Sequence, residues 1–175
     1  MLVNRRGPMT LSEAGQAGAL RGRKGLRMTD LIEGRDWLSS QSTYEGFPIY
    51  FRRPDIRFAE YSSLCADFPL RLTVTHFLAQ VKDNGLPEAD YNASLADFDH
   101  ALIGLLRDSG AAIVTLVETF AGKRTYYLYL RQGVEPEAAL RHVLDNFPRE
   151  RVEWSTKQDP EWRLMNGYVQ DFGFD

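Results

Sequence analysis

The sequence of 175 residues has one cysteine, three histidines and no long apolar run. The single Cys65 excludes an internal disulfide and any zinc site built from several cysteines. No segment approaches the roughly 18 consecutive apolar residues that a membrane-spanning helix requires. We therefore expect a soluble protein of the cytoplasm that does not enter a membrane.

Catalytic and cofactor-binding motifs are also missing. His76, His100 and His142 are dispersed, and no pair has the H-x-x-x-H spacing that places two imidazoles on one metal. The sequence lacks a G-x-S-x-G nucleophile motif and a glycine-rich phosphate loop. These absences predict no metal and no cofactor, and they point to no established class of enzyme.

Charge is distributed unevenly along the chain. Residues 1–28 carry six basic side chains and one acidic side chain, a net charge of +5, so the remainder carries −8 of the total of −3. We expect residues 1–30 to form a disordered basic leader and residues 31–175 to form one α+β domain. The alternatives for the leader are an extension from an upstream start codon, with Met28 as the true first residue, and a basic arm that attracts nucleic acid or anionic lipid.

The order of expected elements predicts a ferredoxin-like α+β fold. Residues 36–53 suit a β-hairpin around Glu45-Gly46, with Pro48 placing its second strand at an edge. From Leu70 onward the expected order is strand, helix, strand, strand, helix, strand, which is the split βαβ arrangement of an antiparallel sheet. The alternating pattern of 70–81 and the hairpin of 111–130 supply three of these strands, and residues 152–156 supply the fourth.

The helices show an apolar face at helical spacing. In the first, the face consists of Leu95, Phe98, Leu102, Leu105 and Leu106, with Ser94 expected at its N-cap. The second begins near Pro136 and ends before Pro148. A short terminal helix is expected after Asp159-Pro160, with Asp159 as its N-cap.

Several short motifs occur in the order seen in a known family. They are Trp37 followed by Gly46-Phe47-Pro48 and Arg52-Arg53, then Asn84-Gly85-Leu86-Pro87, the hairpin segment from Lys123 to Tyr129, and Asp159-Pro160-Glu161-Trp162. Over Asp36 to Val169 the chain resembles the bacterial family known as domain of unknown function 695. That family is similar in fold to the protein regulator B of ribonuclease E, which implies a binding or regulatory module and supplies no catalytic residues.

Two groups of residues are candidates for a site. Glu118 lies in an apolar strand on the same expected face as Val114, Leu116 and Phe120, where burial could raise the pKa of its carboxyl, and His76 lies on an apolar strand face. With Tyr127 and Tyr129, these two could form the cleft of a hydrolase or transferase. The structural alternatives are that His76 is a hydrogen-bonded core residue and that Glu118 either lies at a solvated strand end or pairs with Lys123 or Arg124 across the hairpin.

The second group is a potential binding surface. Tyr127 and Tyr129 share one strand face and lie close to Arg124 in the sequence, which resembles sheets that stack RNA bases. The acidic charge of the domain opposes phosphate binding. We therefore favour a non-enzymatic module that binds another protein, with a homodimer also allowed by its edge strands, over an enzyme or an RNA-binding protein.

Overall fold

The computed structural model describes residues 36–57, 60 and 63–174. Six strands form one sheet in the order β1-β2-β4-β5-β3-β6, and every neighbouring pair is antiparallel. The strands are β1 Trp37–Tyr44, β2 Phe47–Pro54, β3 Leu70–Phe77, β4 Ala112–Phe120, β5 Lys123–Leu130 and β6 Arg151–Gln158. The expected leader lies outside the described residues.

Two tight turns fix the two hairpins of the sheet. Glu45 and Gly46 both have positive φ, as do Ala121 and Gly122. Two-residue turns of this kind match the right-handed twist of the strands that they join, and glycine adopts positive φ without steric cost. The register of β4 and β5 therefore runs from Phe120 opposite Lys123 to Ala112 opposite Leu130, with one irregularity.

The α+β class is confirmed. The helices are α3 Ala89–Ser94, α4 Ala96–Arg107, α5 Glu137–Asn146 and α6 Arg163–Phe172. Strand, helices, two strands, helix and strand follow one another from β3 to β6, and these four strands lie side by side as β4-β5-β3-β6. This order is compatible with the expected split βαβ arrangement, with the β1–β2 hairpin added beyond β4.

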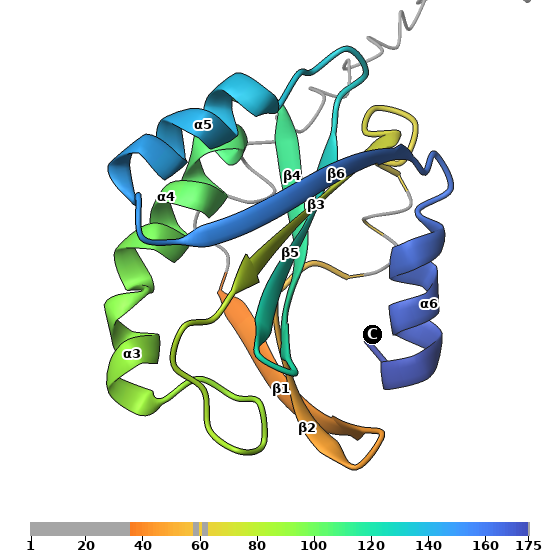
Figure 1. The fold of residues 1–175 in the computed structure, drawn as a ribbon. Helices are drawn as coiled ribbons and strands as arrows, with labels where there is room; N and C mark the ends of the chain where they lie inside the picture. The colour runs from red at the N-terminus through yellow and green to blue at the C-terminus, as the bar shows by residue number, and fades with distance from the viewer. Residues whose placement is uncertain (1–35, 58–59, 61–62, 175) are drawn as a thin grey trace, which may run out of the picture.

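Helices cover both faces of the sheet. Helices α4 and α5 pack on one face, where Phe98, Leu102, Leu140 and Val143 join the side chains of β3, β4 and β5. Figure 1 shows α6 on the opposite face, where it packs with residues of the β2–β3 segment such as Phe68. We call these the α4 face and the α6 face.

Three local expectations need correction. Pro48 does not mark an edge, because β2 lies between β1 and β4; the missing N–H is tolerated since pairing with β4 extends only over Tyr50–Arg52. Ser94 does not cap α4: its hydroxyl donates to the carbonyl of Tyr91, and Leu95 occupies the N-cap position. Asp159 accepts hydrogen bonds from the N–H groups of Arg163 and Leu164, so it caps α6 from three residues before the N-cap position, which Trp162 occupies.

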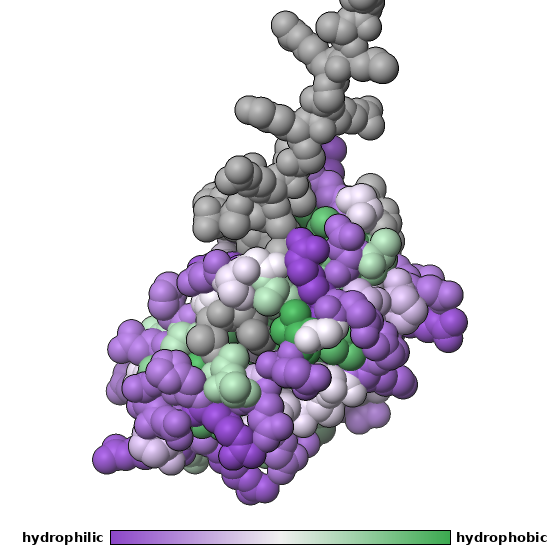
Figure 2. Space-filling view, turned by 90° about the horizontal axis from the view of Figure 1, so that it is seen from above, coloured by the Kyte–Doolittle hydropathy of each residue, from purple (hydrophilic) through white to green (hydrophobic). Residues whose placement is uncertain are grey.

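The surface at the end of the molecule opposite the β1–β2 hairpin is mostly polar. Figure 2, seen from above, shows hydrophilic side chains over most of this end, with small apolar areas among them. No helix within the described ranges has both the length and the apolar character to cross a membrane. The side chains of Leu105 and Leu106 lie outside the described part of the chain.

Candidate functional site

A buried carboxylate, that of Asp99, is the centre of a polar cluster on the α4 face, beside the β1–β2 hairpin. Asp99 is 7% exposed and accepts hydrogen bonds from Nη1 of Arg124 at 2.8 and 3.1 Å, and from Nη2 of Arg52 at 2.7 Å. The hydroxyl of Tyr126 also donates to Asp99. Three donor groups make four hydrogen bonds to one carboxylate, which satisfies a charge that would otherwise be costly to bury.

Arg124 is held on all sides. It is 5% exposed, its Nε donates to the hydroxyl of Thr119 at 3.3 Å, and its Nη2 donates to the side-chain carbonyl of Asn92. The guanidinium is therefore fixed in one orientation by α3, α4 and β4 together. A side chain held in this way supports its neighbours and has little freedom of its own.

Arg52 stands at the boundary between this cluster and solvent. Its side chain is 40% exposed, compared with 6% for Arg124, and its Nη2 is the atom that bonds to Asp99. No other hydrogen bond joins Arg52 to the described residues. Its Nε and Nη1 donors are therefore available on the solvent side of the cluster.

These groups line a cavity of about 520 Å³. The hairpin contributes Ser39, Tyr50, Phe51 and Arg52, the 82–87 loop contributes Lys82, Leu86 and Pro87, and the start of the helical layer contributes alanines and Asn92. Asp99, Thr119 and Arg124 form the inner end of the cavity. The cavity thus joins the β1–β2 hairpin to the buried cluster.

The 82–87 loop is fixed against the tip of the β4–β5 hairpin. Gly85 has φ +80°, and a Cβ at this position would lie 2.9 Å from the Cα of Ala121. The carbonyl of Gly85 accepts a hydrogen bond of 2.8 Å from the N–H of Gly122, and Gly85 donates to the carbonyl of Lys82 at 2.8 Å. Only glycine fits this close approach, so the Asn84-Gly85 motif places Lys82 at the cavity.

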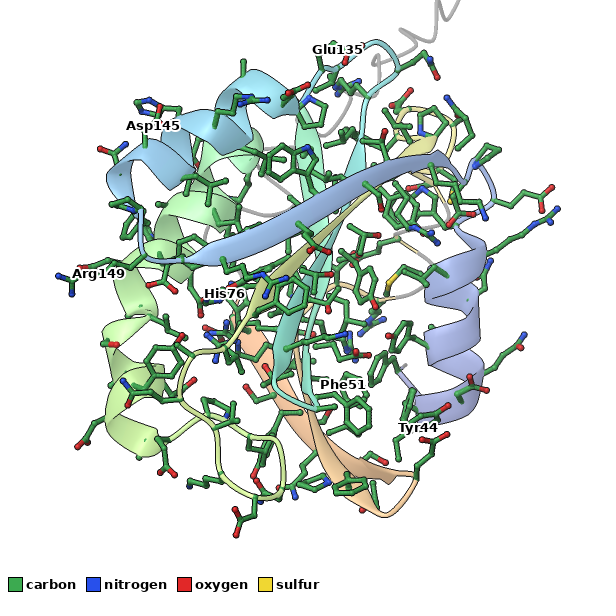
Figure 3. The ribbon with its side chains drawn as sticks, in the orientation of Figure 1. Tyr44, Phe51, His76, Glu135, Asp145 and Arg149 are labelled. Atoms are coloured by element: carbon green, nitrogen blue, oxygen red, sulfur yellow. The ribbon has the colours of Figure 1, made fainter. Side chains whose placement is uncertain are left out.

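His76 and Glu118 lie on opposite faces of the sheet. His76 is fully buried on the α4 face, where its ring contacts Phe98 and its Nε2 lies 2.7 Å from a carboxylate oxygen of Glu150. Figure 3 shows His76 toward the α4 side and Tyr44 toward α6. Burial outweighs the interaction with Glu150 and lowers the pKa of His76, so the neutral imidazole is favoured.

Glu118 is found on the α6 face. It accepts a hydrogen bond from the hydroxyl of Tyr168 and lines a second hollow of about 440 Å³. Burial raises the pKa of Glu118, as expected, although the bond from Tyr168 acts in the opposite direction. Its cross-strand neighbour is Thr125, so the expected pairing with Lys123 or Arg124 is not formed.

A β-bulge explains why one strand face was assigned wrongly. The register shifts between Val114 and Leu116, so Val114 packs on the α4 face while Leu116 packs on the α6 face with Glu118. An extra residue in one strand reverses the side-chain alternation after it. The expected cleft is not formed for a separate reason: His76 of β3 lies on the α4 face against Phe98, whereas Glu118, Tyr127 and Tyr129 lie on the α6 face.

The expected aromatic binding surface is also covered. Tyr129 is 0% exposed and stacks on Trp162 at 4.1 Å between ring centroids, and Tyr127 packs against Tyr168 of α6. Arg124 lies on the other face, bound to Asp99. The expectation was wrong because the terminal helix, amphipathic along its length, closes the face that the tyrosines share.

The sequence carries a pattern that indicates a buried position for Asp99. Asp99 lies one helical turn after Leu95 and one turn before Leu102, which places a carboxylate on the apolar face of the helix. An acidic residue in such a position requires a buried partner. The partner, Arg124, follows Asp99 by 25 residues, and no local pattern connects them.

Comparison with known proteins gives one result. The model of the family of unknown function DUF695 matches residues 35–169. No curated protein and no solved structure matches the chain. The match covers the whole sheet, the Asp99 cluster and most of α6, and on this basis the chain belongs to the family of unknown function DUF695.

Proposed function

We propose that the chain is a non-enzymatic module that binds a partner protein through its β1–β2 hairpin. The observation that carries this proposal is the exposure of apolar side chains. Among the described residues six large hydrophobic side chains are exposed, and all except Val81 lie on the hairpin: Trp37, Leu38, Tyr44, Phe47 and Tyr50. Concentration of exposed apolar residues on one element is characteristic of an interaction site.

The two edges of the sheet differ in the way that this proposal requires. Strand β1 has no charged residue among its eight, and strand β6 carries Arg151, Glu153 and Lys157. Charged side chains on an edge strand discourage pairing with another chain, and an uncharged edge leaves its backbone groups available to a partner strand. Addition of a strand to β1 would supply main-chain hydrogen bonds, and the apolar side chains would supply specificity.

The catalytic candidates support a binding role. His76 is fully buried, Glu118 lies on the other face, and Tyr129 is covered. No group of three or more metal-ligating side chains occurs within the part of the chain that the structure describes. The fold-level relation to the regulator of ribonuclease E stays a prediction.

The test compares two substitutions at exposed apolar positions. We expect Leu38→Lys to abolish capture of a partner protein from the source cell, because it places a charge on the open edge. Val81→Lys is the matched control, since Val81 is exposed to a similar extent, 42% against 39%, and belongs to neither strand of the β1–β2 hairpin. Quantitative mass spectrometry of material captured by the full chain and by each variant measures the effect.

Sedimentation velocity extends the test to self-association. If the partner is a second copy of this chain, we expect concentration-dependent dimers that Leu38→Lys removes and Val81→Lys retains. Capture of the same proteins by all three forms, with no change in self-association, would contradict the proposal.

A further inference from the structure

We propose that the cavity between the hairpin and α3 is a binding site for a carboxylate attached to an apolar group. This site is separate from strand addition at β1, so it can exist whether or not the hairpin binds a partner protein. It is defined by Arg52 and Lys82 at its mouth and by the Asp99–Arg124 pair at its inner end.

The first argument is charge. The residues that line the cavity include three cationic side chains and one carboxylate, a net charge of +2, in a chain whose total charge is −3. Asp99 is shared between Arg124 at 2.8 Å and Arg52 at 2.7 Å, so the two arginines together keep one uncompensated charge and Lys82 supplies the second. A cationic concavity in an acidic protein concentrates anions.

The second argument is the set of available donors. Arg52 uses Nη2 to bond Asp99, which orients its guanidinium plane, and its Nε and Nη1 have no partner among the described residues. The ammonium of Lys82 has no hydrogen bond or ion pair to the residues that the structure describes. An oriented guanidinium and an ammonium that line the same cavity can both pair with a bound carboxylate.

The third argument is the remaining wall. Besides the charged groups, the cavity is lined by three uncharged polar residues, Ser39, Asn92 and Thr119, and by a larger apolar set that comprises Tyr50, Phe51, Leu86, Pro87 and three alanines. A volume of about 520 Å³ lies within the range of about 300–1,000 Å³ typical of small-molecule sites, which pair apolar walls with a few placed polar groups. A fully polar anion would leave these apolar walls unused, which favours an acid that carries an apolar body.

The test uses two acids and their neutral analogues. Isothermal titration calorimetry is performed on the full chain with 4-phenylbutyrate and with 4-phenylbutyramide, and with the peptide acetyl-Ala-Ala-Phe bearing a free or an amidated C-terminus. We expect binding of at least one acid and an affinity at least about tenfold lower for its amide, because a charge-assisted hydrogen bond is lost. The acid with the higher affinity shows whether a small molecule or a peptide terminus is the better source of the carboxylate.

Variants separate the site from its surroundings. Arg52→Gln is expected to weaken binding about tenfold or more. Lys82→Gln, which leaves the Asp99 cluster intact, should weaken it at least about threefold by removing a single charge near the anion. Arg141→Gln is the control, because Arg141 is an exposed arginine that pairs with Glu137 on α5. Absence of binding by both acids, equal binding of the amides, or unchanged affinity in Lys82→Gln would overturn the proposal.

Discussion

The two faces of the sheet solve the problem of buried polar groups differently. On the α4 face, charged and ionisable groups lie under the helices: Asp99 with Arg124, and His76 with Glu150. On the α6 face, aromatic rings fill most of the space, and the polar groups among them are tyrosine hydroxyls, the Glu118 carboxyl and Asp159, which lies 3.6 Å from Arg71. Each face borders a hollow: the one on the α4 face, of about 520 Å³, reaches the buried Asp99–Arg124 pair, whereas the one on the α6 face, of about 440 Å³, is lined by Glu118 and by rings such as Tyr44, Phe120 and Tyr168.

Trp162 and Asp99 each hold one face of the sheet together. Trp162 stacks on Tyr129, donates from Nε1 to the carbonyl of Phe68 at 2.8 Å, and joins three separate segments of the chain. Asp99 joins β2, α4 and β5 in a comparable way, but one of its partners, Arg52, is partly in solvent. Trp162 is therefore an internal support, whereas the Asp99 cluster combines support with one side chain, Arg52, that a ligand can reach.

The largest expected effect is on the aromatic support. Trp162→Ala should lower the free energy of unfolding by at least about 4 kcal/mol, because a void of this size costs roughly 3–5 kcal/mol and the Phe68 carbonyl loses its donor. Trp37→Ala is the matched control, since Trp37 is 37% exposed and Trp162 is 1% exposed. Urea denaturation measures both, and similar losses in the two variants would contradict the assignment of Trp162 to the core.

The next effect concerns the buried charge on the α4 face. Asp99→Asn should lower the free energy of unfolding by about 3 kcal/mol, because Arg124 loses its counter-charge while the amide retains one acceptor. Asp97→Asn on the same helical turn is the control, because Asp97 is exposed, and it should change stability by less than about 0.5 kcal/mol. A loss below about 1 kcal/mol in Asp99→Asn would show that the cluster contributes little to folding.

The smallest effect is a pH dependence of opposite sign on the two faces. The pKa of His76 is below its ordinary value of 6.5, so unfolding takes up a proton in that window and stability falls as the pH drops below 6.5. The pKa of Glu118 is above its ordinary value of 4.5, so unfolding releases a proton and stability falls as the pH rises above 4.5.

Two variants separate these contributions. His76→Gln should remove the loss of stability below pH 6.5, and Glu118→Gln should remove the loss of stability above pH 4.5. Each of these contributions to the free energy of unfolding should be less than about 1 kcal/mol. Urea denaturation at several pH values between 4.5 and 8 tests both. If the two substitutions changed the pH dependence of the free energy of unfolding in the same direction, relative to the unsubstituted chain, the placement of these side chains would be contradicted.

The sequence predicted what depends on local pattern. Helix periodicity at Leu95, Phe98 and Leu102 located α4, and the Ala121-Gly122 turn located the central hairpin. The assignment of faces failed at the bulge near Thr115, whose hydroxyl donates to the carbonyl of Tyr127, because one inserted residue leaves no mark in an apolar run. The Asp99 cluster was missed because its members come from segments that only the sheet order brings together.

The most direct test of this account follows the arginine side chains during ligand binding. Proton–nitrogen correlation spectra of the arginine Nε groups, recorded while 4-phenylbutyrate is added, distinguish the exposed Arg52 from the buried Arg124. The account predicts that the Arg52 resonance shifts in a saturable way, while Arg124 and the indole N–H of Trp162 remain in place. Saturable shifts at Arg124 or Trp162 without one at Arg52 would contradict it.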